Sequence, residues 1–134
     1  MGRRKAREDA FKCIYQLEFM DKPYDKEKIL EFCFEENENL EDEKEYIKII
    51  LNSTIENIDK IDEIILSNLK NWSLSRIAKI DLALLRLSIC ELKFAKVLNT
   101  PVKVAINEAI ELAKIYGNND SKSFINGLLA KVID

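Results

Sequence analysis

The chain opens with a cluster of positive charge that is suited to binding phosphate. Arg3, Arg4, Lys5 and Arg7 place four cationic side chains at the start of a 134-residue protein whose formal net charge is -3. Acidic residues predominate from Glu18 to Glu63. Each phosphate that a cation neutralises releases counterions, whereas the acidic remainder of the protein repels nucleic acid. The pattern predicts a phosphate-binding arm that is confined to the N-terminus.

Aromatic residues accompany these cations. On a helical wheel Arg4, Phe11 and Tyr15 fall within one ~40° sector, with Arg7 nearby. Guanidinium groups beside aromatic rings form a surface on which an unstacked base can lie. That combination favours RNA over duplex DNA as the ligand.

A second interpretation of the same residues stays open. Short basic termini are common, so the arginines can be a solvated helix start while Phe11 and Tyr15 are core residues. Positive charge at a helix N-terminus, however, opposes the helix dipole by ~0.3–1 kcal/mol per close charge. A sequence shaped by stability alone would carry acids there, so the placement indicates a use.

Asp120, Ser121, Lys122 and Phe124 form a second group of candidate residues, near the C-terminus. On the residues alone, Asp120 is a helix cap and Phe124 is a core ring beside the apolar residues that follow it. The cap role and a ligand-binding role are compatible.

The segment that contains this group predicts two helices with a defined stop between them. Thr100 can cap the first helix, Pro101 suits its opening turn, and Gly117 offers a left-handed stop. The second helix begins at Asp120 or Ser121. The polar residues of the first helix are explained by pairing along the helix, so we assign no catalytic role to Lys103, Asn107, Glu108 and Glu111.

Apolar residues at helical spacing predict five earlier helices. They run from Arg3 to Met20, from Asp25 or Lys26 to Glu36, from about Tyr46 to Ile58, from about Asp59 to Leu69, and from Ser75 to Phe94. We expect loops at Asn37 to Asp42 and at Asn71 to Ser75. Strand-like alternation and internal repeats are missing from the sequence, so the fold class is all-α, with about seven helices in one domain over residues 1–134.

The fifth of these helices is apolar around most of its circumference, which predicts that it is packed on several sides. Asp81, Ser88 and Glu91 share one narrow sector, where we expect the helix to reach the surface. On that view Asp81 and Glu91 are solubilising residues, and Arg86 is a structural ion-pair partner.

Several kinds of chemistry are disfavoured. The chain has no histidine, the commonest general base and zinc ligand, and it has neither a glycine-rich phosphate loop nor a GxSxG motif. We therefore expect no enzyme, no metal and no cofactor. Cys13, Cys33 and Cys90 are odd in number and widely spaced in apolar patterns, which favours reduced, buried thiols over disulfides.

The cellular location also follows from composition. The sequence contains no apolar run near the ~20 residues that cross a bilayer. Mixed-charge helical sequence, instead of an apolar cleavable segment, follows the basic N-terminus. We expect a soluble, cytoplasmic protein.

Three segments carry a family resemblance. They are RRKAREDAFKCIYQLEF at the N-terminus, IDLALLRLSICEL in the centre, and KVAINEAIELAK followed by a glycine turn, an Asp-Ser pair and Phe-Ile-Asn-Gly. Their order and spacing resemble the NusB family of bacterial transcription antitermination factors, over the whole chain. The resemblance implies two helical subdomains that share a central buried helix.

The resemblance also implies a function. NusB-like proteins use the arginine-rich start to bind single-stranded boxA RNA of ribosomal RNA leader transcripts, here through Arg3, Arg4, Lys5 and Arg7. Lys5 cannot make the bidentate fork that an arginine makes. The implied RNA surface includes Asp120, Ser121, Lys122 and Phe124, where backbone N-H groups and Lys122 meet phosphate while Asp120 moderates affinity by repulsion.

The resemblance further implies protein partners. The ribosomal protein and transcription factor NusE would dock near Tyr15 and Asp81, and both proteins would join an RNA polymerase antitermination complex. Two alternatives stay open. One is a helical interaction or dimerisation module without RNA affinity, including a possible homodimer; the other is the accessory domain found in some ribosomal RNA cytosine methyltransferases.

Overall fold

Seven α-helices account for most of the computed structural model, which describes residues 2–36 and 41–133. They are α1 (Arg3–Gln16), α2 (Lys26–Glu36), α3 (Glu41–Glu56), α4 (Ile58–Ser67), α5 (Lys79–Ile89), α6 (Val102–Tyr116) and α7 (Ser121–Val132). No strand occurs in the described ranges, so the all-α prediction is confirmed. Part of the predicted loop at Asn37 to Asp42 lies outside the described residues, and α3 already includes Asp42.

Short irregular turns extend or connect these helices. A 3-10 turn at Leu17–Phe19 continues α1 almost to the predicted end at Met20, and another at Leu74–Arg76 precedes α5. A π-helical turn at Cys90–Phe94 continues α5 to its predicted end. The predicted start of α5 at Ser75 is wrong because the backbone is extended at Ile77, and the helix begins only at Lys79.

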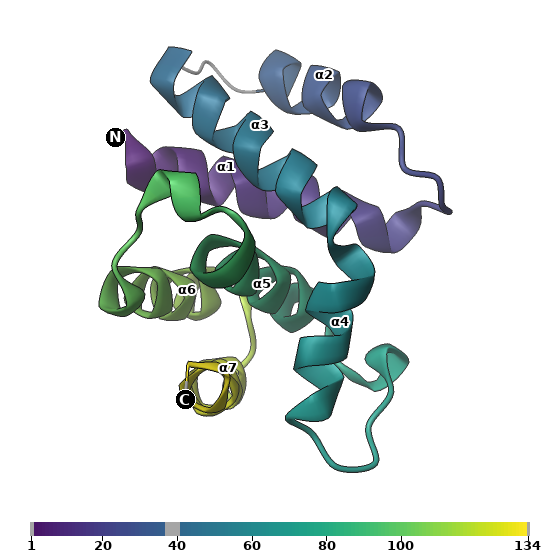
Figure 1. Ribbon diagram of the computed structural model, residues 1–134, viewed down its shortest axis with the longest axis vertical. Coiled ribbons are helices and arrows are strands. Elements are labelled where there is room, and N and C mark those ends of the chain that lie inside the picture. Colours follow the sequence, from purple (N-terminus) through teal and green to yellow (C-terminus); the bar gives the residue numbers. More distant parts are fainter. Residues whose placement is uncertain (1, 37–40, 134) are drawn as a thin grey trace.

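The central helix α5 is the element that the two subdomains share. It contacts α1 and α3 of the N-terminal subdomain, α6 and α7 of the C-terminal subdomain, and α4 between them. Figure 1 shows α5 in the middle of the molecule, with α1 to α3 on one side and α7 on the other. Every residue from Asp81 to Ile89 is buried, and each buried Leu or Ile stabilises the fold by roughly 1.5–3 kcal/mol.

The polar sector of α5 does not reach the surface, which corrects the prediction for Asp81, Ser88 and Glu91. All three residues are buried. The Ser88 hydroxyl donates to the Leu84 carbonyl at 2.8 Å, and Glu91 accepts hydrogen bonds from other elements. The sector faces neighbouring helices that the pattern of one helix does not reveal.

Arg86 also lies on α5, and its predicted role as an ion-pair partner is confirmed. Its Nε and Nη2 donate to the two carboxylate oxygens of Asp62, at 2.9 and 2.8 Å. Its Nη1 donates to Glu18 at 2.8 Å. These bonds join α5 to α4 and to the end of the first helical segment.

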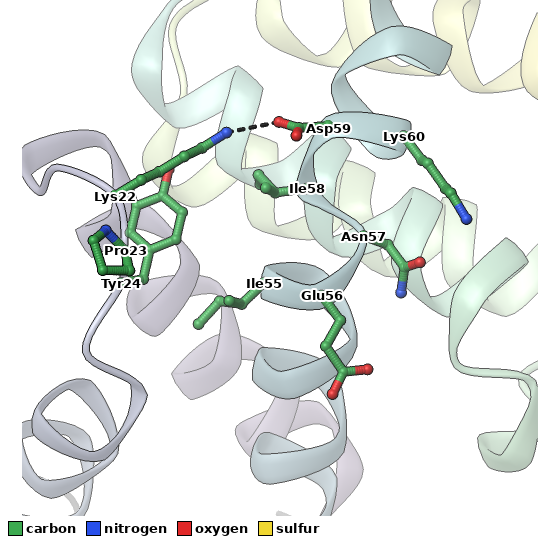
Figure 2. Close-up of a pocket in the computed structure, with 9 residues that line it drawn as sticks. All are labelled: Lys22, Pro23, Tyr24, Ile55, Glu56, Asn57, Ile58, Asp59 and Lys60. Carbon is green, nitrogen blue, oxygen red and sulfur yellow. Dashed lines mark hydrogen bonds and ion pairs between the residues drawn. The ribbon is translucent and has the colours of Figure 1, made fainter.

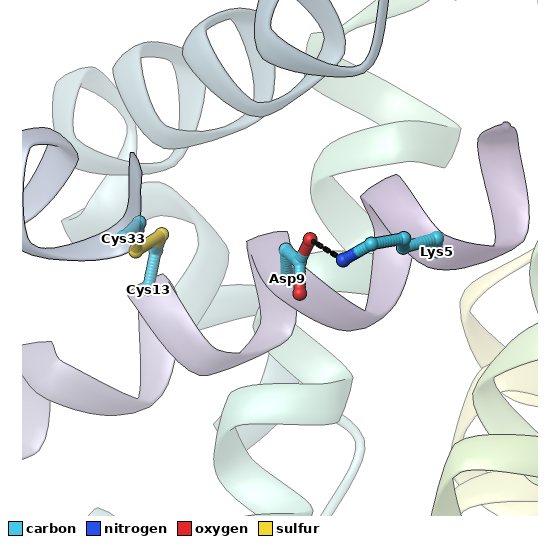
Figure 3. The surroundings of a disulfide bond; sticks show 4 residues. All are labelled: Lys5, Asp9, Cys13 and Cys33. Carbon is cyan, nitrogen blue, oxygen red and sulfur yellow. Dashed lines mark hydrogen bonds and ion pairs between the residues drawn. A yellow bond between two sulfur atoms is a disulfide. The ribbon is translucent and has the colours of Figure 1, made fainter. Parts of the chain in front are cut away.

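The cysteine prediction is wrong for two of the three residues. Cys13 on α1 and Cys33 on α2 form a disulfide bond, although 20 positions separate them (Figure 3). Since α2 packs back against α1, their Cα atoms lie 6.5 Å apart, a proximity that sequence spacing does not reveal. Cys90 is a free, buried thiol as predicted, and burial raises its pKa to about 12.

The signals predicted around α6 act differently from the expectation. The Thr100 hydroxyl donates to Glu91 Oε2 at 2.7 Å instead of capping α6, and Pro101 occupies the N-cap position. Gly117 has φ -89° and ψ -176°, so its backbone is extended and not left-handed. A Cβ atom there would lie 2.5 Å from Ser121 Oγ, so glycine is required for the close approach of α7.

Candidate nucleic-acid interface

Arg7 is the one member of the N-terminal cationic group that is buried, with 3% of its surface exposed. Its Nε donates to Glu91 Oε1 at 2.7 Å and its Nη2 donates to Glu91 Oε2 at 2.9 Å. Tyr46 Oη donates to the same carboxylate at 2.6 Å. The Arg7 fork is thus fully occupied inside the protein, at the junction of α1, α3 and the π-helical turn.

The charges at this junction stabilise one another. Burial of the Glu91 carboxyl raises its pKa, but the hydrogen bonds and charge of Arg7 outweigh burial and hold the pKa below its ordinary value. Burial, followed by the Glu91 charge, raises the pKa of Tyr46, which keeps the phenol protonated as a donor. A buried pair of this kind fixes the first helix against the central one.

The other three cations of the group remain at the surface. Arg4 has a side chain that is 69% exposed, and its Nη2 and Nε donate to the two carboxylate oxygens of Glu108 on α6, at 2.6 and 3.1 Å. Lys5 is half-buried and donates to Asp9, one turn along α1, at 2.9 Å (Figure 3). Arg3 is exposed, with its guanidinium carbon 4.5 Å from the centre of the Tyr46 ring.

The predicted aromatic surface on α1 is only partly present. Phe11 is buried and packs against Tyr116 with ring centroids 5.1 Å apart, so its alternative role as a core residue is correct. Tyr15 is half-buried and meets Phe19 edge to face at 5.1 Å. Sequence reasoning missed Phe19, which is exposed and has the Lys79 ammonium 5.8 Å from its ring centre.

The second candidate group lies at the start of α7. Asp120 occupies the N-cap position, but its side chain makes no capping hydrogen bond, so the predicted side-chain cap is wrong. The Ser121 hydroxyl instead accepts from the Asn118 N-H at 3.0 Å and is buried. Asp120 and Lys122 are exposed.

Phe124, in the first turn of α7, is half-buried and stacks on Trp72, which lies in the loop that the sequence predicted at Asn71 to Ser75. The Trp72 ring lies 5.9 Å from it, centroid to centroid, at an interplanar angle of 26°. The Arg76 guanidinium carbon lies 5.6 Å from the centre of the Trp72 ring. A tryptophan and an arginine four residues apart were the only sequence signal for this cluster.

One cation of the α1 group and one cation of the α7 group act on the same α6 carboxylate, that of Glu111. Lys114, through a 2.9 Å hydrogen bond and its charge, holds the pKa of Glu111 below its ordinary value. The charges of Arg4 and Lys122 act on Glu111 in the same direction. Both predicted cationic groups therefore lie within electrostatic reach of the exposed side of α6.

The predicted protein-partner residues occupy different depths. Tyr15 is half-buried, whereas Asp81 lies beneath the surface at the floor of an open depression of about 430 Å³ that Lys79, Tyr116 and Ser121 also line. Burial raises the pKa of Asp81, and the neighbouring Ser121 side chain partly offsets that effect. The structure thus links Asp81 to the start of α7.

A further hollow lies at the bend between α3 and α4, away from the candidate residues. It has a volume of about 620 Å³ and is lined by residues 22–24 and 55–60, including the Lys22–Asp59 ion pair of 2.6 Å (Figure 2). Within residues 2–36 and 41–133, no cluster of acidic residues and cysteines is arranged to hold a metal ion. None of the helices in the same ranges combines the length and apolar character needed to cross a bilayer.

Comparison with known proteins gives consistent matches over the whole chain. The model of the NusB family matches residues 4–134. The chain is 46% identical to the transcription antitermination protein NusB of Finegoldia magna, covering 99% of this chain and 94% of that protein. It is 42% identical to the protein of the same name from Lachnoclostridium phytofermentans, over the full length of both.

Solved structures agree with these sequence matches. NusB of T. maritima superposes with a TM-score of 0.85 at 36% identity, covering 98% of this chain and 90% of that one. A chain in a crystal structure of the antitermination factors NusB and NusE in complex with dsRNA superposes with a TM-score of 0.85 at 26% identity. That match covers 97% of this chain and 94% of the other.

Proposed function

The chain belongs to the NusB family of transcription antitermination proteins, and we propose that it binds boxA-type RNA of ribosomal RNA leader transcripts together with NusE. The observation that carries this proposal is the exposure of cations at the start of α1 and at the start of α7, with Arg4 and Lys122 both within electrostatic reach of one carboxylate of α6, in a protein of net charge -3. A structural relative was crystallised with NusE and dsRNA, which supports a surface of this kind.

The exposure of each cation determines the role that we assign to it. Arg3, Arg4 and Lys5 contact phosphates, because their charged groups reach solvent. Arg7 acts as a positioning residue, since its guanidinium is engaged by Glu91 and it fixes the helix that carries the other three. This assignment revises the direct phosphate contact that the sequence suggested for Arg7.

The start of α7 supplies the second part of the RNA surface. Lys122 meets phosphate, and the N-H groups of the first turn favour an anion. Ser121 contributes through its backbone, because its hydroxyl is buried against Asn118. Phe124 offers part of a ring to a base, while the exposed Asp120 weakens binding by repulsion.

NusE docks beside this surface in the proposal. Tyr15 contributes a partly exposed ring. Asp81 and Ser121 both line the depression next to α7, and Asp81 contributes to its shape. The two proteins then present one composite RNA surface to the RNA polymerase antitermination complex. We place this activity in the cytoplasm, in one domain over residues 1–134, without catalysis, metal or cofactor.

The test is a titration of fluorescently labelled, single-stranded boxA-like RNA at several salt concentrations, with and without NusE. Replacing Arg3, Arg4 and Lys5 by alanine removes three phosphate contacts, so the slope of log affinity against log salt should fall by roughly 2. Replacing the exposed Lys28, Lys48 and Lys60 by alanine makes the same charge change elsewhere and should preserve most of the slope. Equal effects of both triple variants would show that Arg3, Arg4 and Lys5 contribute only through the net charge of the protein.

Related measurements separate the remaining interpretations. A duplex of the same sequence reports the preference for single strands. Sedimentation tests for a homodimer. If NusE displaces the second copy of this chain, the homodimer should be replaced by a complex of one copy with NusE. A protein that binds NusE but shows no RNA affinity at any salt concentration would be an interaction module.

A further inference from the structure

Trp72 exposes part of its side chain to solvent beside the candidate RNA surface. The residue is 42% exposed, although tryptophan is the largest apolar side chain in the protein. Its ring stacks on Phe124 at 5.9 Å and 26°, and the Arg76 guanidinium carbon is 5.6 Å from its centre. The exposed part of Trp72, stacked on Phe124 and with the Arg76 guanidinium over its ring, is the platform that a ligand would meet.

The loop that carries Trp72 is anchored by the residues that follow Trp72 in the sequence. The Arg76 N-H donates to the Ser73 carbonyl at 3.0 Å, and the Ile77 N-H donates to the Leu74 carbonyl at 3.1 Å. Ile77 is buried and Leu74 packs against the core. The platform is therefore pre-formed, which lowers the entropy cost of binding a ligand.

Charge identifies the kind of ligand that fits this platform. The segment from Lys70 to Lys79 contains three cations and no acidic residue, within a protein of net charge -3. Lys122 adds a further exposed cation two positions before Phe124. An exposed ring flanked by cations suits a stacked base with its neighbouring phosphate better than it suits an apolar peptide.

We propose that Trp72 is a base-stacking residue that extends the RNA site beyond Phe124, with Arg76 contacting the adjacent phosphate. The inference rests on the proposed RNA-binding function and assigns it a second stacking position. The occupant is a base of a single strand, because a base in a duplex is already stacked on its neighbours and does not expose its face.

The chain offers a direct probe, since Trp72 is its only tryptophan. Intrinsic fluorescence excited selectively for tryptophan reports this ring alone in the unmodified chain. Adding unlabelled single-stranded boxA-like RNA should quench that signal, with the same midpoint as the anisotropy of labelled RNA. With NusE present, a parallel titration of the Trp72→Phe chain supplies the background.

Substitutions test how much the Trp72 ring contributes to RNA affinity. Trp72→Ala should weaken RNA binding about 5- to 50-fold, as expected for loss of one stacked base, whereas Trp72→Phe should stay within about 3-fold. Trp72→Leu retains an apolar side chain for packing on Phe124 but lacks an aromatic face, so it should resemble Trp72→Ala. Phe32→Ala is the matched control, because Phe32 is an exposed ring on α2 and should leave RNA affinity unchanged.

Salt dependence distinguishes stacking from a merely structural role. Trp72→Ala should preserve the slope of log affinity against log salt, while Arg76→Ala should lower it by about 0.7 for one lost phosphate contact. Circular dichroism of each variant confirms that the fold is retained.

The outcomes separate this inference from the proposed function. RNA binding by anisotropy, without quenching and with unchanged affinity of Trp72→Ala, would overturn the stacking role and leave the function standing. Fluorescence that changes only on addition of NusE would assign Trp72 to the protein interface instead. Failure of RNA to bind any form of the chain would overturn both proposals.

Discussion

The Arg7 guanidinium and the Glu91 carboxylate meet in two parallel hydrogen bonds of 2.7 and 2.9 Å, although the residues are 84 positions apart. Their side chains are almost completely buried. Tyr46 and Thr100 donate to the same carboxylate, so three helical elements and the loop before α6 converge on one charged pair. This junction sets the position of α1, and with it the direction in which Arg3 and Arg4 face solvent.

Arg7→Ala should therefore act on stability and not only on RNA binding. Removing one partner leaves the Glu91 charge buried without its counterion, which costs about 3–5 kcal/mol in the free energy of unfolding. Urea denaturation followed by circular dichroism measures the loss. Arg3→Ala is the matched control, because Arg3 is exposed and loses only its contact with the Tyr46 ring, so it should change stability by about 1 kcal/mol at most while it weakens RNA binding. An Arg7→Ala chain as stable as the parent would show that the pair is dispensable.

Glu108→Gln should tighten RNA binding. The Arg4 fork is occupied by Glu108 at 2.6 and 3.1 Å, so an incoming phosphate must compete with that carboxylate. Glutamine removes the competing charge while it keeps an oxygen acceptor, and we expect a gain of about 2- to 5-fold at moderate salt. Anisotropy titrations measure the effect.

A double-mutant cycle assigns that gain to the right residue. In an Arg4→Ala background Glu108→Gln should lose most of its benefit, because the remaining partner of Glu108, the Arg7 guanidinium at 3.5 Å, is buried and cannot reach an incoming phosphate. Glu63→Gln, an equal charge change on the exposed side of α4, controls for net charge. The same gain from Glu63→Gln as from Glu108→Gln would argue for a bulk electrostatic effect.

Helical periodicity was sufficient to predict the architecture. Apolar spacing, together with the stop predicted near Gly117, indicated all seven helices, and the crowded circumference of α5 indicated a helix packed on several sides. Errors arose where local backbone bonds decide the path, as at Leu74 to Ile77 before α5. The disulfide between Cys13 and Cys33 was missed because the packing of α2 on α1 determines that proximity, and spacing does not reveal it.

The sequence predicted which residue types form the candidate site, but not which of their side chains are exposed to a ligand. The sequence identified the cations of the first turn, yet it could not distinguish Arg7, which is buried against Glu91, from Arg4, which is exposed. Their acidic partners lie 84 and 104 positions away, so no local pattern carries the information. Asp81 and Glu91 were placed at the surface for the same reason: what covers one side of α5 belongs to other helices.

Asp120→Asn should tighten RNA binding at little cost in stability. The Asp120 side chain is exposed and makes no capping bond to α7, so its removal leaves no orphaned backbone group. It also places a negative charge two positions before Lys122, where phosphate is proposed to bind. We expect a gain of about 2- to 5-fold at fixed salt, measured by anisotropy. Asp25→Asn, at another exposed position, serves as the control, and an equal or weaker affinity of Asp120→Asn would contradict the repulsive role.

Asp81 should make stability depend on pH in the opposite sense to Glu91. Burial raises the pKa of Asp81 in the folded protein, so the fold is penalised as pH rises from the ordinary pKa through the raised one. Asp81→Asn removes the penalty and should raise the urea midpoint at pH 7, with a difference that disappears near pH 3.5. The pKa of Glu91 is lowered, so its contribution is present above its ordinary pKa and is lost as pH falls through the lowered value. Asp21→Asn, an exposed carboxyl, supplies the control, and a midpoint at pH 7 below that of the parent would contradict the penalty.

Gly117 and Gly127 offer a matched pair for testing the contact between α6 and α7. A Cβ atom on Gly117 would lie 2.5 Å from Ser121 Oγ and 2.8 Å from the Ala113 carbonyl oxygen, whereas a Cβ atom on Gly127 would meet nothing within 4 Å. Gly117→Ala should therefore destabilise the protein by about 1–3 kcal/mol through overpacking. Gly127→Ala, within α7, should stabilise it by about 0.5–1 kcal/mol, because alanine loses less conformational freedom in a helix. Thermal and urea unfolding measure both effects, and RNA affinity should fall only for Gly117→Ala, since only that change displaces the start of α7. Equal behaviour of the two variants would show that the close approach of Gly117 to Ser121 does not position the α7 part of the site.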